Sequence, residues 1–313
     1  MFVPRITSPR RVSAPTTSSP SPHPGRGSAG TERADDGAHP VNDLARPLFS
    51  SLQGYVPAAG LQPPAVQAAA AFLFDPERGL VFYEKHADDQ RSIASLTKVM
   101  TLVLAVNAGN LDRPIHIGPD AAALVSSANS YMGVSSGERL TLRDLLYGLV
   151  VGSGNDAAVA IADGISETQA TFVALMNSRA RRFGLTQTHF VTPDGVDNGN
   201  LSTAHDLAIL TAIALMTPGV EHITSTRHTT IPTTGTHKAF ELWSSNDLLP
   251  GGRAPYPGAN GVKSGYTERA SYCLAFSARR QGHLLVGVLL GDPSADARDR
   301  DAHALLDWGF AQE

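Results

Sequence analysis

The sequence predicts an α+β fold: an antiparallel sheet built from both ends of the chain and flanked by helices, with a helical subdomain inserted between the two groups of strands. Strand-like patterns occur at 66–74 and 80–85 and return across 261–291. The stretch between them, from about 120 to 217, carries almost only helical patterns. Because each strand must bury its apolar face against other elements, we expect the two groups to join in one sheet.

The first 65 residues differ in composition from the rest. Pro, Ser, Thr, Gly and Arg dominate there, and eight of the 21 prolines lie before position 50. Periodic apolar patterns are missing, so we predict a disordered extension at 1–65 and a folded domain at 66–313. Arg10-Arg11 would suit a twin-arginine export signal, but no apolar segment of about 7–15 residues follows, so we find no recognisable signal peptide.

The folded part begins with two strands joined by a turn at Asp75-Pro76-Glu77-Arg78-Gly79. Ser95 is followed almost at once by an apolar segment, Val99 to Val106, which stops at Asn107-Ala108-Gly109. This pattern predicts a mostly buried helix that begins at Ser95. An extended segment with polar edges is expected from Leu111 to Ile117.

The inserted block is predicted to contain four helices. Thr141-Leu142-Arg143-Asp144 has the form of a capping box before a helix from Leu145 to Val151. A turn at 152–156 leads to a second helix that runs through Ala162. The remaining two are expected at about 168–183 and from a cap at Ser202 or Thr203 to just before Thr217-Pro218.

The C-terminal part returns to strands. Gln281-Gly282 forms the turn of a hairpin between the last two of them. The expected strands are 226–233, 238–243, 261–266, 271–280 and 283–291, and the final helix is 296–310.

Composition excludes several classes of protein. The formal net charge of -4 gives no indication of nucleic-acid binding. Cys273 is the single cysteine, so an internal disulfide is impossible, and its apolar strand predicts a buried structural thiol. No stretch approaches the roughly 20 apolar residues of a transmembrane segment. The eleven histidines show no metal-binding spacing, and we predict no metal or other cofactor.

Ser95 and Lys98 form the first candidate site. Residues three apart share a helical face, so Lys98 projects beside Ser95. A serine hydroxyl needs a base to become a nucleophile, and a lysine can be that base when burial or nearby positive charge lowers its pKa. S-x-x-K also occurs by chance in capped helices with a surface lysine. Only four lysines occur in the chain, however, and one inside an apolar helix is unusual here.

Two further motifs follow in order. Ser153-Gly154-Asn155 lies on a turn between helices, where the hydroxyl can relay a proton and the carboxamide can bind a peptide-like substrate. Lys263-Ser264-Gly265 lies on a strand, where a cation and a hydroxyl suit a substrate carboxylate and Gly265 permits close approach of a substrate backbone. Taken alone, Ser153-Gly154-Asn155 would indicate only an ordinary turn. Lys263-Ser264-Gly265 alone would indicate an edge strand whose lysine prevents pairing with other chains.

One of these segments also fits a nucleotide-binding fingerprint. Gly152-x-Gly154-x-x-Ala157 opens a helix, but that function needs a preceding strand and an acidic residue about 20 positions later. Residues 168–193 contain no Asp or Glu. We therefore reject a dinucleotide site.

The three motifs and their flanks closely resemble those of the low-molecular-mass D-alanyl-D-alanine carboxypeptidases, the S11 serine peptidases among the penicillin-binding proteins. The resemblance runs from about residue 66 to 313. The segments that carry it are Ile93 to Thr101, Asp144 to Leu149, Ser153 to Ala158 and Gly261 to Thr267.

The resemblance implies a D,D-peptidase/β-lactamase-like fold and a catalytic domain over 66–313. It implies that Ser95 attacks the penultimate D-Ala of a peptidoglycan stem peptide with Lys98 as base, and that β-lactam antibiotics acylate the same serine. Ser153, assisted by Lys263, would then protonate the departing D-Ala amine. The implied substrate contacts come from Asn155, Ser264, Gly265, the backbone N–H groups of Ser95 and Tyr266, and, by position, Arg298.

Some features depart from this family pattern. Ser264 stands where Thr is usual, and Asp194 stands where His is frequent, which leaves the function of its loop open. The usual signal, C-terminal β-rich domain and amphipathic anchor are not recognisable, so we expect a soluble or otherwise tethered enzyme. Peptidoglycan lies outside the membrane, so the family resemblance implies an extracytoplasmic location and a part in cell-wall synthesis and cell shape.

Three other functions remain open. A D,D-endopeptidase that cuts cross-links would share every motif. A β-lactamase is less favoured, because Ser153-Gly154-Asn155 lacks the Asp of the class A tripeptide and Glu167 has no matching context. A non-hydrolytic peptidoglycan-binding module would not need the catalytic side chains. Tyr131 is expected at the edge of the cleft without a chemical role.

Overall fold

The computed structural model describes residues 52–55, 62–126 and 130–312, all of which belong to one compact unit, Ala38–Glu313. Most of the predicted N-terminal extension lies outside the described residues. Within it, Gln53–Gly54 forms the short strand β1, so regular structure begins earlier than the expected boundary at residue 65. That boundary stays a prediction.

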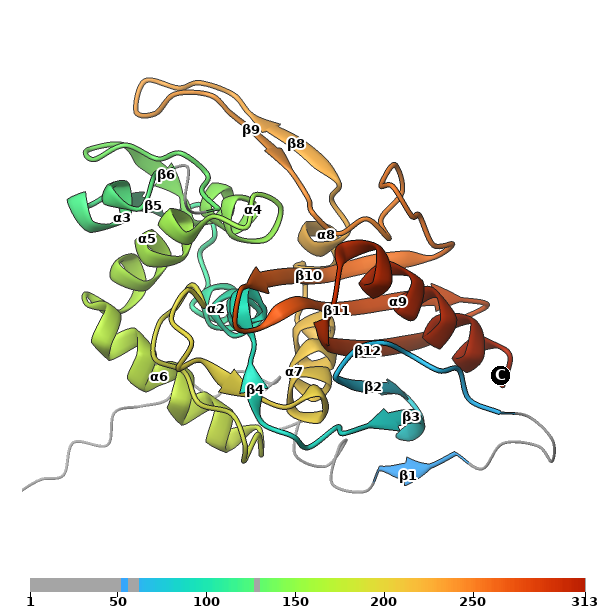
Figure 1. Cartoon of the computed structure of the whole chain (residues 1–313). Coiled ribbons are helices and arrows are strands. Elements are labelled where there is room, and N and C mark those ends of the chain that lie inside the picture. The colour runs from blue at the N-terminus through green and yellow to red at the C-terminus, as the bar shows by residue number, and fades with distance from the viewer. Residues whose placement is uncertain (1–51, 56–61, 127–129, 313) are drawn as a thin grey trace, which may run out of the picture. The chain divides into compact units, whose positions relative to one another are not determined.

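The central sheet has six strands in the order β1-β3-β2-β12-β11-β10 (Figure 1). All neighbours are antiparallel except β1, which runs parallel to β3. Strands β2 and β12 lie side by side at the centre, so the predicted union of the two chain ends is confirmed. The strands are β2 (Ala70–Asp75), β3 (Leu80–Lys85), β10 (Ala259–Thr267), β11 (Ser271–Arg280) and β12 (His283–Asp292).

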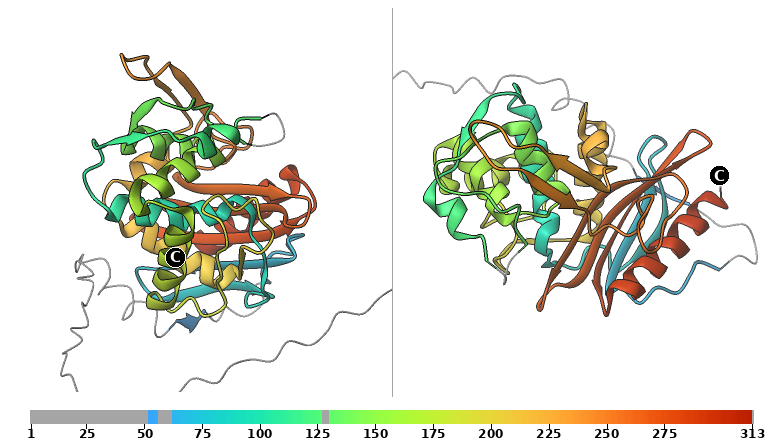
Figure 2. Two further views of the ribbon diagram at one scale, coloured as in Figure 1. Left: turned by 90° about the vertical axis from the view of Figure 1, so that its left-hand side faces the viewer. Right: turned by 90° about the horizontal axis from the view of Figure 1, so that it is seen from above.

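The two faces of the sheet bury separate apolar clusters. Along β2, Phe72 and Phe74 point into the larger cluster, which the helical block covers, whereas Leu73 points into the smaller one. Alternation with a period of two is what a strand buried on both faces requires. Helix α9 (Ala295–Phe310) packs on the second face, and α7 (Ala204–Met216) packs on the first (Figure 2).

The predicted helices are present in the inserted block. The capping box is confirmed, because the Thr141 side chain accepts from the Asp144 N–H and the Asp144 carboxylate accepts from the Thr141 N–H. Thr203, rather than Ser202, caps α7. The remaining long helices are α2 (Lys98–Asn107), α4 (Leu142–Val150), α5 (Asn155–Ser166) and α6 (Gln169–Arg182).

The extended segment expected from Leu111 to Ile117 is confirmed by a strand within it, β5 (Pro114–His116). The other short elements were not predicted, because each is too short to show a period. They are α3 (Pro119–Ala123), α8 (Val220–Thr224), the strand pair β4 (Arg91–Ser92) with β7 (Leu201–Ser202), and β6 (Arg139–Thr141), which pairs with β5. The hairpin of β8 (His228–Ile231) and β9 (Phe240–Trp243) confirms the two less regular strands and projects from the domain (Figure 1). None of the described helices is long and apolar enough to span a membrane.

Candidate active site

A cleft of about 650 Å³ lies where the sheet edge β10, the helical block and the start of α9 meet. Seven residues predicted to form the site line it, and Lys98 and Lys263 are buried close by. The seven are Ser95, Ser153, Asn155, Ser264, Gly265, Tyr266 and Arg298. The fold therefore brings together residues that are widely separated in the sequence.

Ser95 lies in a single 3₁₀ turn, Ala94–Thr97, directly before α2. Ala94 adopts a positive φ of 47°, and the backbone of Gly195 packs against its carbonyl so closely that a Cβ at position 195 would collide with it. On the other side, a Cβ at Gly265 would lie 3.0 Å from the Ser95 nitrogen. The turn that holds Ser95 therefore packs against the backbones of Gly195 and Gly265. The missing side chain of Gly265 makes room for this turn, and not only for the backbone of a substrate.

Lys98 is fully buried and its Nζ donates to three oxygens. The distances are 2.9 Å to Ser95 Oγ, 2.8 Å to Asn155 Oδ1 and 2.6 Å to the Asp194 carbonyl. Burial lowers the Lys98 pKa to about 8, although the carboxylates of Asp194 and Asp156 oppose that shift. A lysine with this pKa is substantially neutral near pH 8 and can accept the proton of the serine beside it.

The second motif lies on the turn between α4 and α5. Ser153 has a positive φ of 54°, which directs this short turn, and both Ser153 and Asn155 face the cleft. The Asn155 carbonyl oxygen is held by Lys98, so the second motif is tied directly to the first.

Asp156 supports this turn from behind and was not singled out from the sequence. Its buried carboxylate accepts from the backbone N–H groups of Met132, Gly133 and Val134 at 2.7–3.1 Å. It therefore anchors an irregular segment to the start of α5. An acidic residue in the first helical turn was the available signal, but the partner segment could not be foreseen.

The third motif lies in the middle of β10. Lys263 is buried and its Nζ donates to the Ser264 carbonyl at 2.8 Å. Its pKa lies well below the ordinary value because of burial and, next, the positive charges of Lys98 and Arg298. Lys263 thus places a second buried amino group beside the same cleft.

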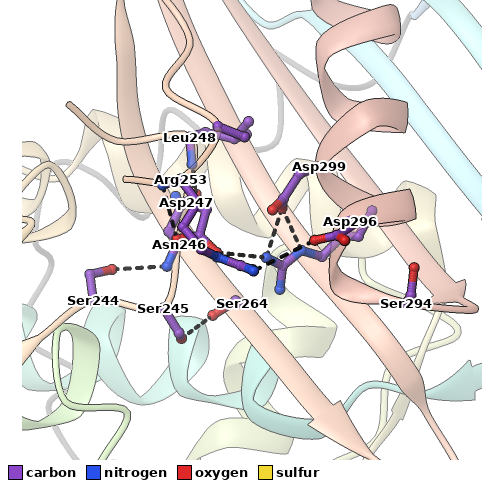
Figure 3. Close-up of polar contacts among 12 residues, drawn as sticks. Ser244, Ser245, Asn246, Asp247, Leu248, Arg253, Ser264, Ser294, Asp296 and Asp299 are labelled. Carbon is purple, nitrogen blue, oxygen red and sulfur yellow. Dashed lines mark hydrogen bonds and ion pairs between the residues drawn. The ribbon is translucent and has the colours of Figure 1, made fainter. Parts of the chain in front are cut away.

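The far end of the cleft gathers groups suited to a carboxylate. Ser264 Oγ lies 2.6 Å from Ser245 Oγ, and both line the cleft (Figure 3). Arg298, on the first turns of α9, is only 5% exposed, and its Nη2 donates to Asp299 Oδ1 at 2.7 Å. The position predicted for Arg298 from the family pattern is therefore in the cleft.

The loop of Asp194 contributes through its backbone. The Asp194 carbonyl accepts from Lys98, while its carboxylate accepts from Thr192 Oγ1 at 2.7 Å and from the Val196 N–H at 3.1 Å. The side chain folds the loop, and the loop supplies an oxygen to the lysine. A side chain at this position need not take part in chemistry.

Other lining residues could not be inferred from the sequence motifs. They are Ser130, Gly195, Val196, Ser245, Asp247, Arg253, Thr267, Tyr272 and Ala295. Tyr131 does not line the cleft and is 45% exposed. Cys273 is fully buried, and burial raises the pKa of its thiol to about 12, in agreement with a structural thiol.

Comparison with known proteins decides the family. The family model for D-alanyl-D-alanine carboxypeptidases, Peptidase_S11, matches residues 58–294. The chain belongs to this family of serine peptidases. The predicted family, fold and enzyme class are therefore confirmed.

Individual relatives agree with this assignment. A D-alanyl-D-alanine carboxypeptidase of Streptomyces sp. (strain K15) is 36% identical over 84% of this chain and 94% of its own length. The carboxypeptidase DacF of Bacillus subtilis (strain 168) is 33% identical over 79% of this chain, which spans only 63% of that protein.

Solved structures of the S11 carboxypeptidase family superpose well. The crystal structure of the Streptomyces K15 DD-transpeptidase has a TM-score of 0.75 at 32% identity, covering 80% of this chain and 100% of that one. The D-alanyl-D-alanine carboxypeptidase from Mycobacterium tuberculosis H37Rv has a TM-score of 0.73 at 30% identity, covering 82% of this chain and 95% of that one.

Proposed function

We propose that the protein removes the terminal D-Ala from peptidoglycan stem peptides through an acyl-enzyme on Ser95. The observation that carries this proposal is the 2.9 Å contact between Lys98 Nζ and Ser95 Oγ, made by a buried lysine with a pKa of about 8. Neutral Lys98 takes the hydroxyl proton as Ser95 Oγ bonds to the carbonyl carbon of the penultimate D-Ala. The backbone N–H groups of Ser95 and Tyr266 stabilise the oxyanion that forms.

Collapse of this tetrahedral intermediate breaks the C–N bond. Ser153 passes its hydroxyl proton to the departing amine and receives in exchange the proton that Lys98 took from Ser95, with electrostatic assistance from Lys263. Water then attacks the ester and restores the Ser95 hydroxyl. Asn155 holds a substrate amide, while Ser264 and Arg298 bind the terminal carboxylate and Gly265 leaves room for the peptide.

A β-lactam enters by the same route and acylates Ser95. The ring-opened product stays attached to the protein, so water must displace it. The comparisons do not favour the alternatives of a β-lactamase, a cross-link endopeptidase or a non-hydrolytic binding module. The substrate places the enzyme outside the cytoplasmic membrane, in the periplasm, at the cell wall or secreted.

Intact-protein mass after incubation with benzylpenicillin tests the nucleophile. We expect one slowly decaying penicilloyl adduct on the wild type and none on Ser95→Ala. Rapid drug hydrolysis without a lasting adduct would instead indicate a β-lactamase. Release of D-Ala from a peptide ending in D-Ala-D-Ala tests the activity itself, and failure of the wild type to release D-Ala would refute the proposal. Addition of glycine as an amine acceptor measures transfer in place of hydrolysis.

A further inference from the structure

The far end of the cleft contains an ion-pair network that none of the three motifs includes. The loop between β9 and β10 contributes Asp247 and Arg253, and the first turn of α9 contributes Asp296 (Figure 3). Asp247 and Arg253 line the same cleft as Ser95 and Arg298. The network therefore borders the position where a leaving D-Ala would lie.

Asp247 is the centre of this network. Its side chain is only 9% exposed, and Oδ2 accepts from Arg253 Nε at 3.0 Å and from Arg253 Nη2 at 2.7 Å. Oδ1 lies 3.4 Å from Arg227 Nη2. Oδ2 also lies 4.0 Å from Arg298 Nη2, so this carboxylate is a near neighbour of the arginine assigned to the substrate.

Arg253 extends from the loop toward α9. Its Nη1 lies 3.6 Å from Asp296 Oδ1, while the side chain is 63% exposed. Figure 3 shows the side chains of Asp247, Arg253 and Asp296 close to one another, with the Ser245–Ser264 contact nearby. The arginine thus connects the two elements that bound the end of the cleft.

The arrangement creates a competition for Arg298. A guanidinium that already pairs with Asp299 can still bind a substrate carboxylate, but a second free carboxylate 4.0 Å away would attract it and repel the substrate. The two-point pairing with Arg253 fixes Asp247 and offsets its charge.

We propose that Arg253 is a specificity-determining residue: it neutralises Asp247 and closes this end of the cleft, so that the site favours leaving groups with a free terminal carboxylate. The inference rests on the proposed carboxypeptidase function. A purely structural salt bridge would stabilise the loop without distinguishing between substrates.

Selectivity is measured as the ratio of kcat/KM for a peptide ending in D-Ala-D-Ala to that for the same peptide with a C-terminal amide. For Arg253→Ala we expect KM for the free acid to rise about tenfold with kcat nearly unchanged, and the acid-to-amide ratio to fall about tenfold. Arg253→Lys retains the charge but loses the two-point geometry and should give an intermediate ratio. Arg300→Ala, an exposed arginine on α9, is the matched control.

The double variant Asp247→Asn/Arg253→Ala separates charge from loop stability. Removing the carboxylate that Arg253 leaves behind should restore most of the acid-to-amide ratio, even if the melting temperature stays low. An unchanged ratio in Arg253→Ala, or a double variant as unselective as the single one, would overturn the inference. If Arg253→Ala fails to fold, the comparison of Arg253→Lys with wild type decides in the same way. A wild type that releases no D-Ala would instead refute the proposed function.

Discussion

Buried basic side chains lie at both ends of the cleft, but their hydrogen-bond partners differ in charge. At the nucleophile end, Lys98 donates to a hydroxyl, a carboxamide oxygen and a backbone carbonyl, all of them neutral. At the other end, Arg298 donates to the carboxylate of Asp299. Neutral partners do not offset the cost of burying charge, so the pKa of Lys98 falls, whereas an arginine beside carboxylates stays charged.

This difference separates chemistry from recognition. A residue that must lose and regain a proton needs a pKa near the working pH, and burial of a lysine provides that. A residue that must attract a substrate carboxylate needs permanent charge, and a buried arginine needs counter-ions to keep it. The same cleft therefore uses lysine beside the serine and arginine beside the leaving group.

The largest effect is expected at the lysine. Lys98→Met removes the base but fills a similar volume, so kcat/KM for D-Ala release should fall by roughly a thousandfold. Acylation by benzylpenicillin, followed by intact mass, should slow in parallel. A matched control is Lys238→Met, since Lys238 is exposed. Acylation at the wild-type rate by Lys98→Met would contradict the assignment of Lys98 as the base, because another group would then have to accept the Ser95 proton.

The pH dependence of acylation should follow the neutral form of Lys98. With a pKa of about 8, the rate should rise about tenfold per pH unit below pH 8 and level off above it. The proposed contacts to the substrate carboxylate do not involve Lys98, so KM should not share this inflection. Stopped-flow acylation between pH 5.5 and 9.5, about two units either side, measures both quantities. A flat profile would show that Lys98 is not the titrating base.

Asp156 affects both the stability of the nucleophile end and the pKa of Lys98, and the two effects can be measured separately. Asp156→Asn directs an amide toward three buried N–H donors, so the free energy of unfolding should fall by about 3 kcal/mol. Asp156 also raises the pKa of Lys98, so its removal should move the acylation inflection to lower pH. Asp163→Asn, on the same helix, is the control. Loss of stability without a shift of the inflection would show that Asp156 does not influence the pKa of Lys98.

The nucleophile end could be predicted from the sequence far better than the other. Ser95 and Lys98 are three residues apart on one helical turn, so local geometry alone places them together. The patterns also predicted the long strands and helices, since each shows a period over many residues. The resemblance to a known family then supplied Ser153, Lys263 and Arg298, which no local rule would bring to one cleft.

The leaving-group end depends on tertiary structure. Asp247 and Arg253 are six residues apart in a loop rich in Gly and Pro, and nothing periodic indicates that this loop folds back over the start of α9. Ser245 faces Ser264 only because the loop runs beside β10. The contact between the Asp194 carbonyl and Lys98 could not be predicted, because every residue type has a backbone carbonyl.

The smallest effect on catalysis is expected at Asp292, which acts on stability and is an exception among the charges near Arg298. This buried carboxylate has no hydrogen-bond donor among the described residues, and burial, then the neighbouring charge of Asp301, raises its pKa to about 8; Arg298 and Lys85 oppose the rise. The folded protein therefore holds a proton that the unfolded chain loses near pH 4, so this group makes the free energy of unfolding fall as pH rises from about 4 to 8.

Asp292→Asn should remove that slope, so the free energy of unfolding of the variant relative to wild type should be about 4 kcal/mol higher at pH 8 than at pH 5, because the amide is neutral in both the folded and the unfolded chain. Urea unfolding at pH 5 and pH 8, with Asp307→Asn as a control on α9, measures the difference. Equal slopes in wild type and variant would mean that Asp292 is ionised throughout. In that case Asp292 would be a further counter-ion of Arg298. The leaving-group end would then contain only ion-paired charges, whereas Lys98 at the nucleophile end has neutral hydrogen-bond partners.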